Sequence, residues 1–174
     1  TGVQTCALPI LDFLMVRQIT WSGMGSDTLF SNPQNWSPQS VPAEHDIAVF
    51  DGTCVKDCTI DMDIDVAGMD INDGYTGIVT QASGSTITVG FSDFNQAGGT
   101  FAGSDSTITI NSDLRISDGT FTASSGTTTL YDDMVITGGT FDHNTGQTTF
   151  VDSVGSTVNI GTAALNNVIG DLHK

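Results

Sequence analysis

The sequence predicts an all-β fold, a single-stranded parallel β-helix (β-solenoid) with about five coils of roughly 20 residues each. Three observations predict this fold. A Gly-Thr-Phe triplet recurs at 20-residue intervals, ending at Phe101, Phe121 and Phe141. Apolar and polar residues alternate with period two between the triplets, as in strands with one buried face. The chain is rich in Thr, Ser, Gly and Asp and poor in residues that favour helices.

Each repeat follows the same order of turns and strands. A small polar turn follows each phenylalanine, and then a Thr-rich strand such as Thr107 to Ile110. A polar corner and an apolar strand such as Leu114 to Ile116 complete the unit. Twenty residues cannot form a core alone, so we expect the coils to stack and the three phenylalanines to form an internal ladder. The glycines before them are expected at corners that need positive φ.

A sandwich of ordinary β-hairpins is the alternative fold. Identical residues at a fixed spacing favour in-register stacking over that arrangement. The solenoid is expected over 59–174, truncated at its C-terminus. At its start, strict alternation over 59–66 predicts one strand. Ile60, Met62, Ile64 and Val66 would lie on its inner face, and Asp61, Asp63 and Asp65 on its outer face.

Two segments precede the predicted solenoid. Residues 1–10 look like the translation of a sequencing adapter, so we expect them to be an artefact and exclude them from the fold. Residues 11–58 are expected to form an N-terminal segment and cap. They contain both tryptophans, Trp21 and Trp36, and aromatic side chains can cover the end of a solenoid whose strand edge is otherwise unpaired.

The charge of the chain restricts its partners. Twenty acidic residues oppose four basic ones, giving a net charge of −16. Such a field repels phosphate backbones and anionic lipids, so nucleic acid is not an expected partner. No apolar stretch reaches the length of about 20 residues that a membrane-spanning helix needs.

Several short motifs resemble those of a group of bacterial secreted and cell-surface β-helix proteins with pectin-lyase-like or autotransporter/adhesin-like architecture. The motifs are Trp21 with Gly23, Asn35 with Trp36, Pro42 with Asp46, Gly74 to Gly77, and the three Gly-Thr-Phe repeats. The resemblance spans about residues 20 to 160. It implies a β-helix, a secreted or cell-surface location, and glycans or other surface polymers as partners.

The acidic residues offer candidate calcium ligands. Asp61, Asp63 and Asp65 would project from one strand face, and polysaccharide lyases of the resembled architecture bind calcium through outer-face aspartates. Alternate residues of a strand lie about 7 Å apart, which is too far for three carboxylates to share one ion unaided. Solvated surface charge is therefore the favoured interpretation, and no other cofactor is predicted.

Two other motifs suggest chemistry that the sequence does not support. Asp132 and Asp133 with His143 resemble the carboxylates and histidine of β-helix glycosidases. Adjacent strand residues point to opposite faces, however, and turns favour aspartate pairs. Residues Gly23 to Leu29 match part of a calcium-binding nonapeptide that works only in tandem, so coincidence is the preferred explanation. We assign no catalytic residue.

Cys54 and Cys58 are the only cysteines outside the first ten residues. In an exported protein a local disulfide between them is favoured, with two free thiols and a zinc site as alternatives. His45, His143 and His173 are isolated and expected to face solvent.

The sequence therefore predicts a non-catalytic structural or adhesive segment of a secreted or surface-attached protein. The alternative is a carbohydrate-active β-helix enzyme, a polysaccharide lyase or a glycosidase, that uses calcium.

Overall fold

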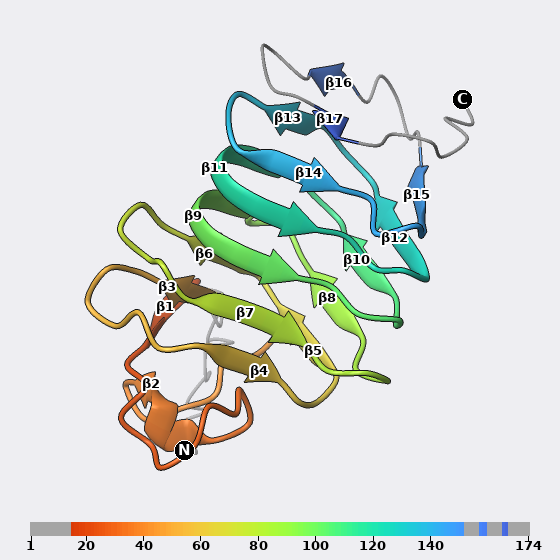
Figure 1. Cartoon of the computed structure of the whole chain (residues 1–174). Helices are drawn as coiled ribbons and strands as arrows, with labels where there is room; N and C mark the ends of the chain where they lie inside the picture. Colours follow the sequence, from red (N-terminus) through yellow and green to blue (C-terminus); the bar gives the residue numbers. More distant parts are fainter. Residues whose placement is uncertain (1–14, 152–156, 160–164, 167–174) are drawn as a thin grey trace, which may run out of the picture.

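A computed structural model describes residues 15–151, 157–159 and 165–166 of the chain (Figure 1). It confirms the all-β prediction and the β-solenoid of about five turns, because parallel strands from successive coils pair in register. Apart from one turn of 3-10 helix, η1 (Pro33–Asn35), the described residues form only strands and loops. None of the helical segments in the described chain has the length and hydropathy that crossing a membrane requires.

Each coil contributes one strand segment to each of three faces. The first face contains β3 (Asp46–Phe50), β6 (Gly68–Ile71), the first halves of β9 (Phe94–Ala102) and β11 (Leu114–Thr122), β13 (Met134–Ile136) and β16 (Val158–Asn159). The second face contains β4 (Cys58–Ile60), β7 (Ile78–Gln81), the second halves of β9 and β11, β14 (Thr140–Asp142) and β17 (Leu165–Asn166). The third face contains β5 (Ile64–Val66), β8 (Ile87–Val89), β10 (Ile108–Ile110), β12 (Thr127–Leu130) and β15 (Gln147–Phe150).

Glycines turn the chain from the first face to the second. Gly99, Gly119 and Gly139, the residues before each Thr-Phe pair, have φ angles of 53°, 76° and 67°. The left-handed region strains any residue with a Cβ atom. A Cβ atom at Gly119 would also lie 2.5 Å from the carbonyl oxygens of Gly98 and Gly99 in the coil below. The recurring glycine is therefore required both by the backbone conformation and by the close approach of the coils.

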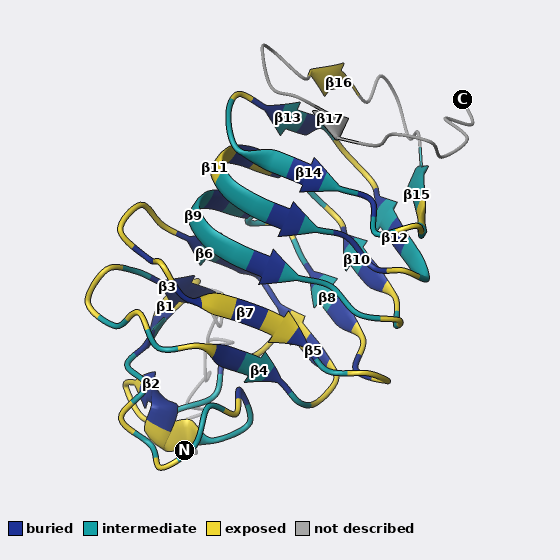
Figure 2. Cartoon of the chain, in the orientation of Figure 1, coloured by how far each residue is buried: buried dark blue, intermediate teal, exposed yellow. Residues whose placement is uncertain are grey.

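An aromatic stack fills the interior behind the second face. Phe101, Phe121 and Phe141 occupy equivalent register positions, and their rings stack with centroids 4.9 and 5.7 Å apart. Phe94 from the first face meets both Phe101 and Phe121 edge-on at 5.1 Å. Figure 2 shows the resulting pattern, in which buried residues recur along the stacked strands and many exposed ones lie in the loops and corners. The Gly-Thr-Phe repeat thus supplies both the corner and the core.

A second aromatic cluster closes the N-terminal end of the stack. β1 (Arg17–Trp21) pairs with the two-residue strand β2 (Trp36–Ser37) and with β3. Trp36 lies at the centre of the cluster, with ring centroids 5.0 Å from Trp21, 4.8 Å from Phe30 and 5.6 Å from Phe50. This arrangement matches the aromatic cap that the sequence predicts.

Two details differ from the sequence predictions. The parallel stack reaches back beyond residue 59, because β3 pairs in parallel with β6. The segment 59–66 is not one strand: it forms the end of β4 and then β5, with a corner at 61–63. Ile60, Ile64 and Val66 are buried as expected, but Met62 is 43% exposed. The alternation of apolar and polar residues continues through this corner, so the sequence pattern did not reveal it.

Candidate functional site

An aspartate ladder runs along the corner that leads from the third face into the first. Asp93, Asp113 and Asp133 stand one residue before the first-face strands of three successive coils. The Asp113 amide donates to Asp93 Oδ1 at 3.2 Å, and the Asp133 amide donates to Asp113 Oδ1 at 3.0 Å. The Thr157 amide continues the series by donating to Asp133 Oδ1 at 2.7 Å. Each carboxylate therefore accepts a hydrogen bond from a backbone amide of the next coil. That amide lies just outside the strand and has no partner in the β-sheet.

One arginine compensates part of the ladder's negative charge. Arg115 projects from β11, with Nε 3.4 Å from Asp93 Oδ2 and Nη2 in contact with Asp113 Oδ2. Among the described residues, no basic side chain forms a comparable ion pair with Asp133. Hydrogen bonds from the backbone and side chain of Thr157, aided by the charge of Arg115, lower the pKa of the Asp133 carboxyl. The ladder carboxylates are therefore held in place by backbone donors from the next coil and, at Asp93 and Asp113, by the Arg115 side chain.

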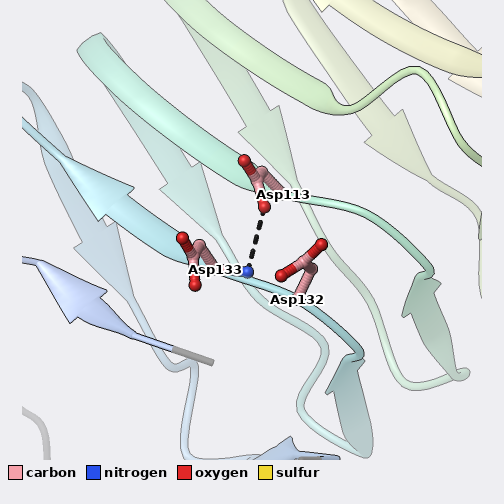
Figure 3. Close-up of side chains that lie close together, drawn as sticks. All are labelled: Asp113, Asp132 and Asp133. Carbon is pink, nitrogen blue, oxygen red and sulfur yellow. Dashed lines mark hydrogen bonds between the residues drawn. The ribbon is translucent and has the colours of Figure 1, made fainter. Parts of the chain in front are cut away.

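Asp132 joins two ladder residues in a three-carboxylate group (Figure 3). One oxygen each from Asp113, Asp132 and Asp133 lie within 4.8 Å of one another, and no other such group of His, Cys, Asp or Glu occurs among the described residues. Carboxylate oxygens are calcium ligands, but calcium takes six to eight of them. Both oxygens of Asp113 and one of Asp133 already accept hydrogen bonds. The group can offer only an exposed, partial coordination sphere.

The three aspartates that the sequence suggested as calcium ligands, Asp61, Asp63 and Asp65, have separate surroundings and do not form one site. Asp61 accepts hydrogen bonds from the amide and hydroxyl of Ser31, at 3.0 and 2.7 Å, and so ties the cap to the first coil. Asp63 accepts from the Thr86 amide of the next coil at 2.7 Å, and this bond lowers the pKa of its carboxyl. Asp65 is exposed on β5. These three carboxylates are not among the described groups that could hold a metal ion.

The predicted glycosidase-like trio is not brought to one place. Asp132 and Asp133 occupy the corner before β13, whereas His143 follows β14 at the corner between the second and third faces. His143 is 8% exposed, so the prediction that it faces solvent is wrong. It turns inward because it continues the inward alternation of Phe141 past the end of the strand. His45 is half-buried, and His173 lies outside the described residues.

The partial calcium nonapeptide forms a loop that holds a lysine. The Lys56 ammonium donates to the carbonyl oxygens of Gly23, Gly25 and Asp27, at 3.1, 3.2 and 2.8 Å. The Asp27 carboxylate turns away from them and accepts from Asn32, Asn35 and the Leu29 amide, and these bonds lower its pKa. A side-chain cation thus occupies the carbonyl ring, and the loop is part of the cap.

Cys54 and Cys58 are free thiols, so the expected local disulfide does not close this loop. Cys58 is the inward-facing first residue of β4 and lies in the core, whereas Cys54 sits half-buried in the preceding loop. Burial, together with the charge of Asp61, raises the pKa of the Cys58 thiol. A buried thiol that stays protonated behaves as a small apolar side chain.

A shallow groove of about 260 Å³ lies on the outer surface where the first face ends. Eight residues from three coils line it: Asn95, Gln96, Ala97, Arg115, Ile116, Ser117, Val135 and Thr137. Its one charged group is Arg115, which already contacts two carboxylates. The amide of Gln96 donates to the Thr120 carbonyl at 2.8 Å, while its side-chain oxygen is buried without a partner.

The aspartate ladder was missed at the level of sequence, although a signal for it exists. Aspartate precedes Phe94, Leu114 and Met134, the first residues of three first-face strands, at the same 20-residue spacing as the phenylalanines. The Lys56 contact has no comparable signal, because its partners lie about 30 residues earlier in an irregular loop.

Comparisons with protein-family models, with curated proteins and with solved structures give no match to this chain. The fold and the geometry described above therefore carry the functional argument.

Proposed function

We propose that this chain is a non-catalytic structural segment of a secreted or surface-attached bacterial protein: a rigid, acidic stalk with adhesive faces. The observation that carries the proposal is the continuity of two ladders through successive coils. The Phe101–Phe121–Phe141 stack joins the coils inside, and the Asp93–Asp113–Asp133 ladder joins them at a corner. The phenylalanines supply apolar contacts, and the ladder carboxylates accept hydrogen bonds from the next coil, so both ladders serve the stack itself.

The mechanism of such a segment is geometric. Each coil adds about 4.8 Å to the length of the stack, and the hydrogen bonds between coils resist bending. The net charge of −16 keeps stalks from associating with one another or with anionic surfaces. The motifs shared with bacterial surface β-helix proteins support the secreted or cell-surface location, and the flat polar faces suit glycans or other surface polymers.

A carbohydrate-active enzyme is the second candidate, and the groove favours it. Arg115 lies in that groove, and the Asp113–Asp132–Asp133 group lies at the neighbouring corner. An arginine beside a calcium ion could bind an acidic sugar, since it forms paired hydrogen bonds with carboxylates. Against this, Arg115 is committed to Asp93 and Asp113 and would have to leave them to act as a base.

Incubation with polygalacturonate and related polymers, with and without calcium, separates the two candidates. A stalk releases neither unsaturated nor reducing products under either condition. Product release by the wild type that disappears in an Arg115→Ala variant would establish the enzyme and contradict the stalk. An Arg17→Ala variant is the matched control, because Arg17 pairs with Asp46 far from the groove.

Calcium can also act as a purely structural ion, and the same samples test this role. Binding at the three-carboxylate group would raise the melting temperature with calcium and not with magnesium. An Asp132→Ala variant should lose that rise, because Asp132 carries none of the hydrogen bonds of the ladder itself. Equal melting temperatures with and without calcium would exclude the ion as a structural component.

A further inference from the structure

The third face of the solenoid presents a regular array of threonines. In β8, β10 and β12 the buried residues alternate with outward ones, and the register aligns Thr88, Thr109, Thr129 and Thr149 in one row. A second row stands two residues earlier in each strand, with Thr107 and Thr127 between Thr86 and Gln147. We call these eight residues the threonine face. The strands that carry it lie one above another along the stack (Figure 1).

Most hydroxyls of this face make no hydrogen bond to the described part of the protein. Within the described part of the chain, the side chains of Thr88, Thr107, Thr109, Thr127, Thr129 and Thr149 make no hydrogen bond to another protein group. Thr86, at the first edge, bonds to Asp63. The polar side chains of the adjoining corner behave differently, since Ser83, Asp105 and Ser124 are all bonded to neighbouring coils. Among the described residues, the threonine face therefore keeps most of its side-chain donors and acceptors available to a partner.

The threonine face is also uncharged, in a chain of net charge −16. Asp65, in register with Thr88, marks its lower end. The next outward positions along the coils, Asn111, Tyr131 and Val151, are uncharged too. The acidic surface elsewhere on this protein would attract a positively charged partner. The threonine face has no charges, so its surface is complementary to a neutral partner.

The spacing of the array defines the partner further. Strands of a parallel stack lie about 4.8 Å apart, and alternate residues along one strand lie about 6.6 Å apart. Both distances are fixed by the backbone, and threonine holds a stiff χ1 angle, so little entropy is lost when a partner orders these side chains. A surface that repeats in two directions fits a partner that repeats in the same two directions.

We propose that the threonine face binds ice. Oxygen atoms on the prism surface of hexagonal ice repeat in two perpendicular directions with spacings close to those of the array. Each threonine offers a hydroxyl that can replace a lattice water as donor and acceptor, and a methyl group that fills the space between lattice positions. A crystalline polysaccharide fits less well, because neither row contains an aromatic side chain on which sugar rings could stack.

The test measures ice-crystal shaping and thermal hysteresis of the purified chain, together with inhibition of ice recrystallisation. The wild type should show all three activities. Thr109→Tyr, which places a ring at the centre of the array, should abolish them. Thr120→Tyr is the matched control, since Thr120 is an outward, half-buried threonine of the second face, in register with Thr100 and Thr140. It should leave the ice activities unchanged.

Circular dichroism and the melting temperature show whether each variant keeps its fold. A wild type without ice activity overturns the proposal, as does a folded Thr109→Tyr variant that is as active as the wild type. Equal loss in the Thr120→Tyr variant overturns it as well. Sedimentation with crystalline cellulose and chitin tests the polysaccharide alternative. The face would be assigned to a polysaccharide if the wild type bound either polymer but showed no ice activity, and if Thr109→Tyr removed that binding. The stalk proposal is unaffected by any of these outcomes.

Discussion

Single aspartates hold successive coils together at the corner before the first face. Asp133 accepts the Thr157 amide at 2.7 Å, and its carboxyl has a lowered pKa. A carboxyl with a lower pKa in the folded than in the unfolded chain stabilises the fold above its unfolded pKa, which is about 4. That stabilisation is lost as the pH falls through the folded-state pKa.

An Asp133→Asn variant tests this contribution. At about pH 6 it should melt below the wild type, because the amide is a weaker acceptor for Thr157 than the carboxylate. The difference in melting temperature should narrow as the pH falls through the lowered folded-state pKa, because the wild-type carboxyl then becomes protonated too. Asp73→Asn, at an exposed turn, is the control and should show a smaller difference. A gap that stays constant across this pH range would contradict the role of Asp133.

Lys56 has a structural role of the same local kind. Replacing it with methionine keeps the stem of the side chain and removes the donor from the carbonyls of Gly23, Gly25 and Asp27. Leaving half-buried acceptors without a donor should cost about 2 kcal/mol in the free energy of unfolding, measured by urea titration. Val55→Ala, at an exposed neighbouring position, should cost much less. Equal effects would show that the ring of carbonyls does not depend on the lysine.

Within the strands, each inward-facing side chain packs against the side chains at the same position in the neighbouring coils. Phe121 lies between Phe101 and Phe141 and also meets Phe94, so three aromatic rings pack against it. Its removal opens a cavity that rigid, hydrogen-bonded strands cannot close.

Phe121→Ala should therefore lower the free energy of unfolding by about 4 kcal/mol. Phe121→Leu, which keeps most of the volume, should cost less than about half as much. Tyr131→Ala removes a 40% exposed aromatic of the same repeat and serves as the control, with an effect below about 1 kcal/mol. A Phe121→Ala variant as stable as Tyr131→Ala would show that the ring stack does not hold the coils together.

The repeat spacing predicted the strands of the stack, but it did not predict every corner between them. The Gly-Thr-Phe spacing predicted the stack because glycine, threonine and phenylalanine each have one role there: corner, outer position and core. The corner at 61–63 was not predictable from periodicity, since Asp61 and Asp63 continue the alternation without a Gly or Pro to end the strand. The aspartate ladder was readable from its spacing, but the Lys56 contact depends on how a loop folds over a coil 30 residues away.

Because the whole molecule is a stack of similar coils, one complete coil can be removed without changing how the remaining coils pair. Residues 114–133 form one complete turn, because Leu114 pairs with Met134 and Asp113 stacks below Asp133. Deleting these 20 residues joins Asp113 to Met134 and preserves the register of all three faces.

We expect this deletion variant to fold, with an unchanged circular dichroism spectrum and a maximum dimension about 5 Å shorter by small-angle scattering. Deleting only 114–123 removes half a turn and places β12 over the wrong face, so that variant should not fold. If the half-turn deletion folded as well as the full-turn deletion, stacking in register would not be what specifies the structure.

Hydrogen bonds between coils run along the axis of the stack, from the capped end at β1 to the described end at β16. A pulling force applied along that axis therefore places the hydrogen bonds between every pair of neighbouring coils in tension. We expect the coils to separate one after another, so that the proposed stalk would extend in steps and absorb work over a long distance. In that role, the stepwise extension would soften a sudden load on the structure that the stalk holds.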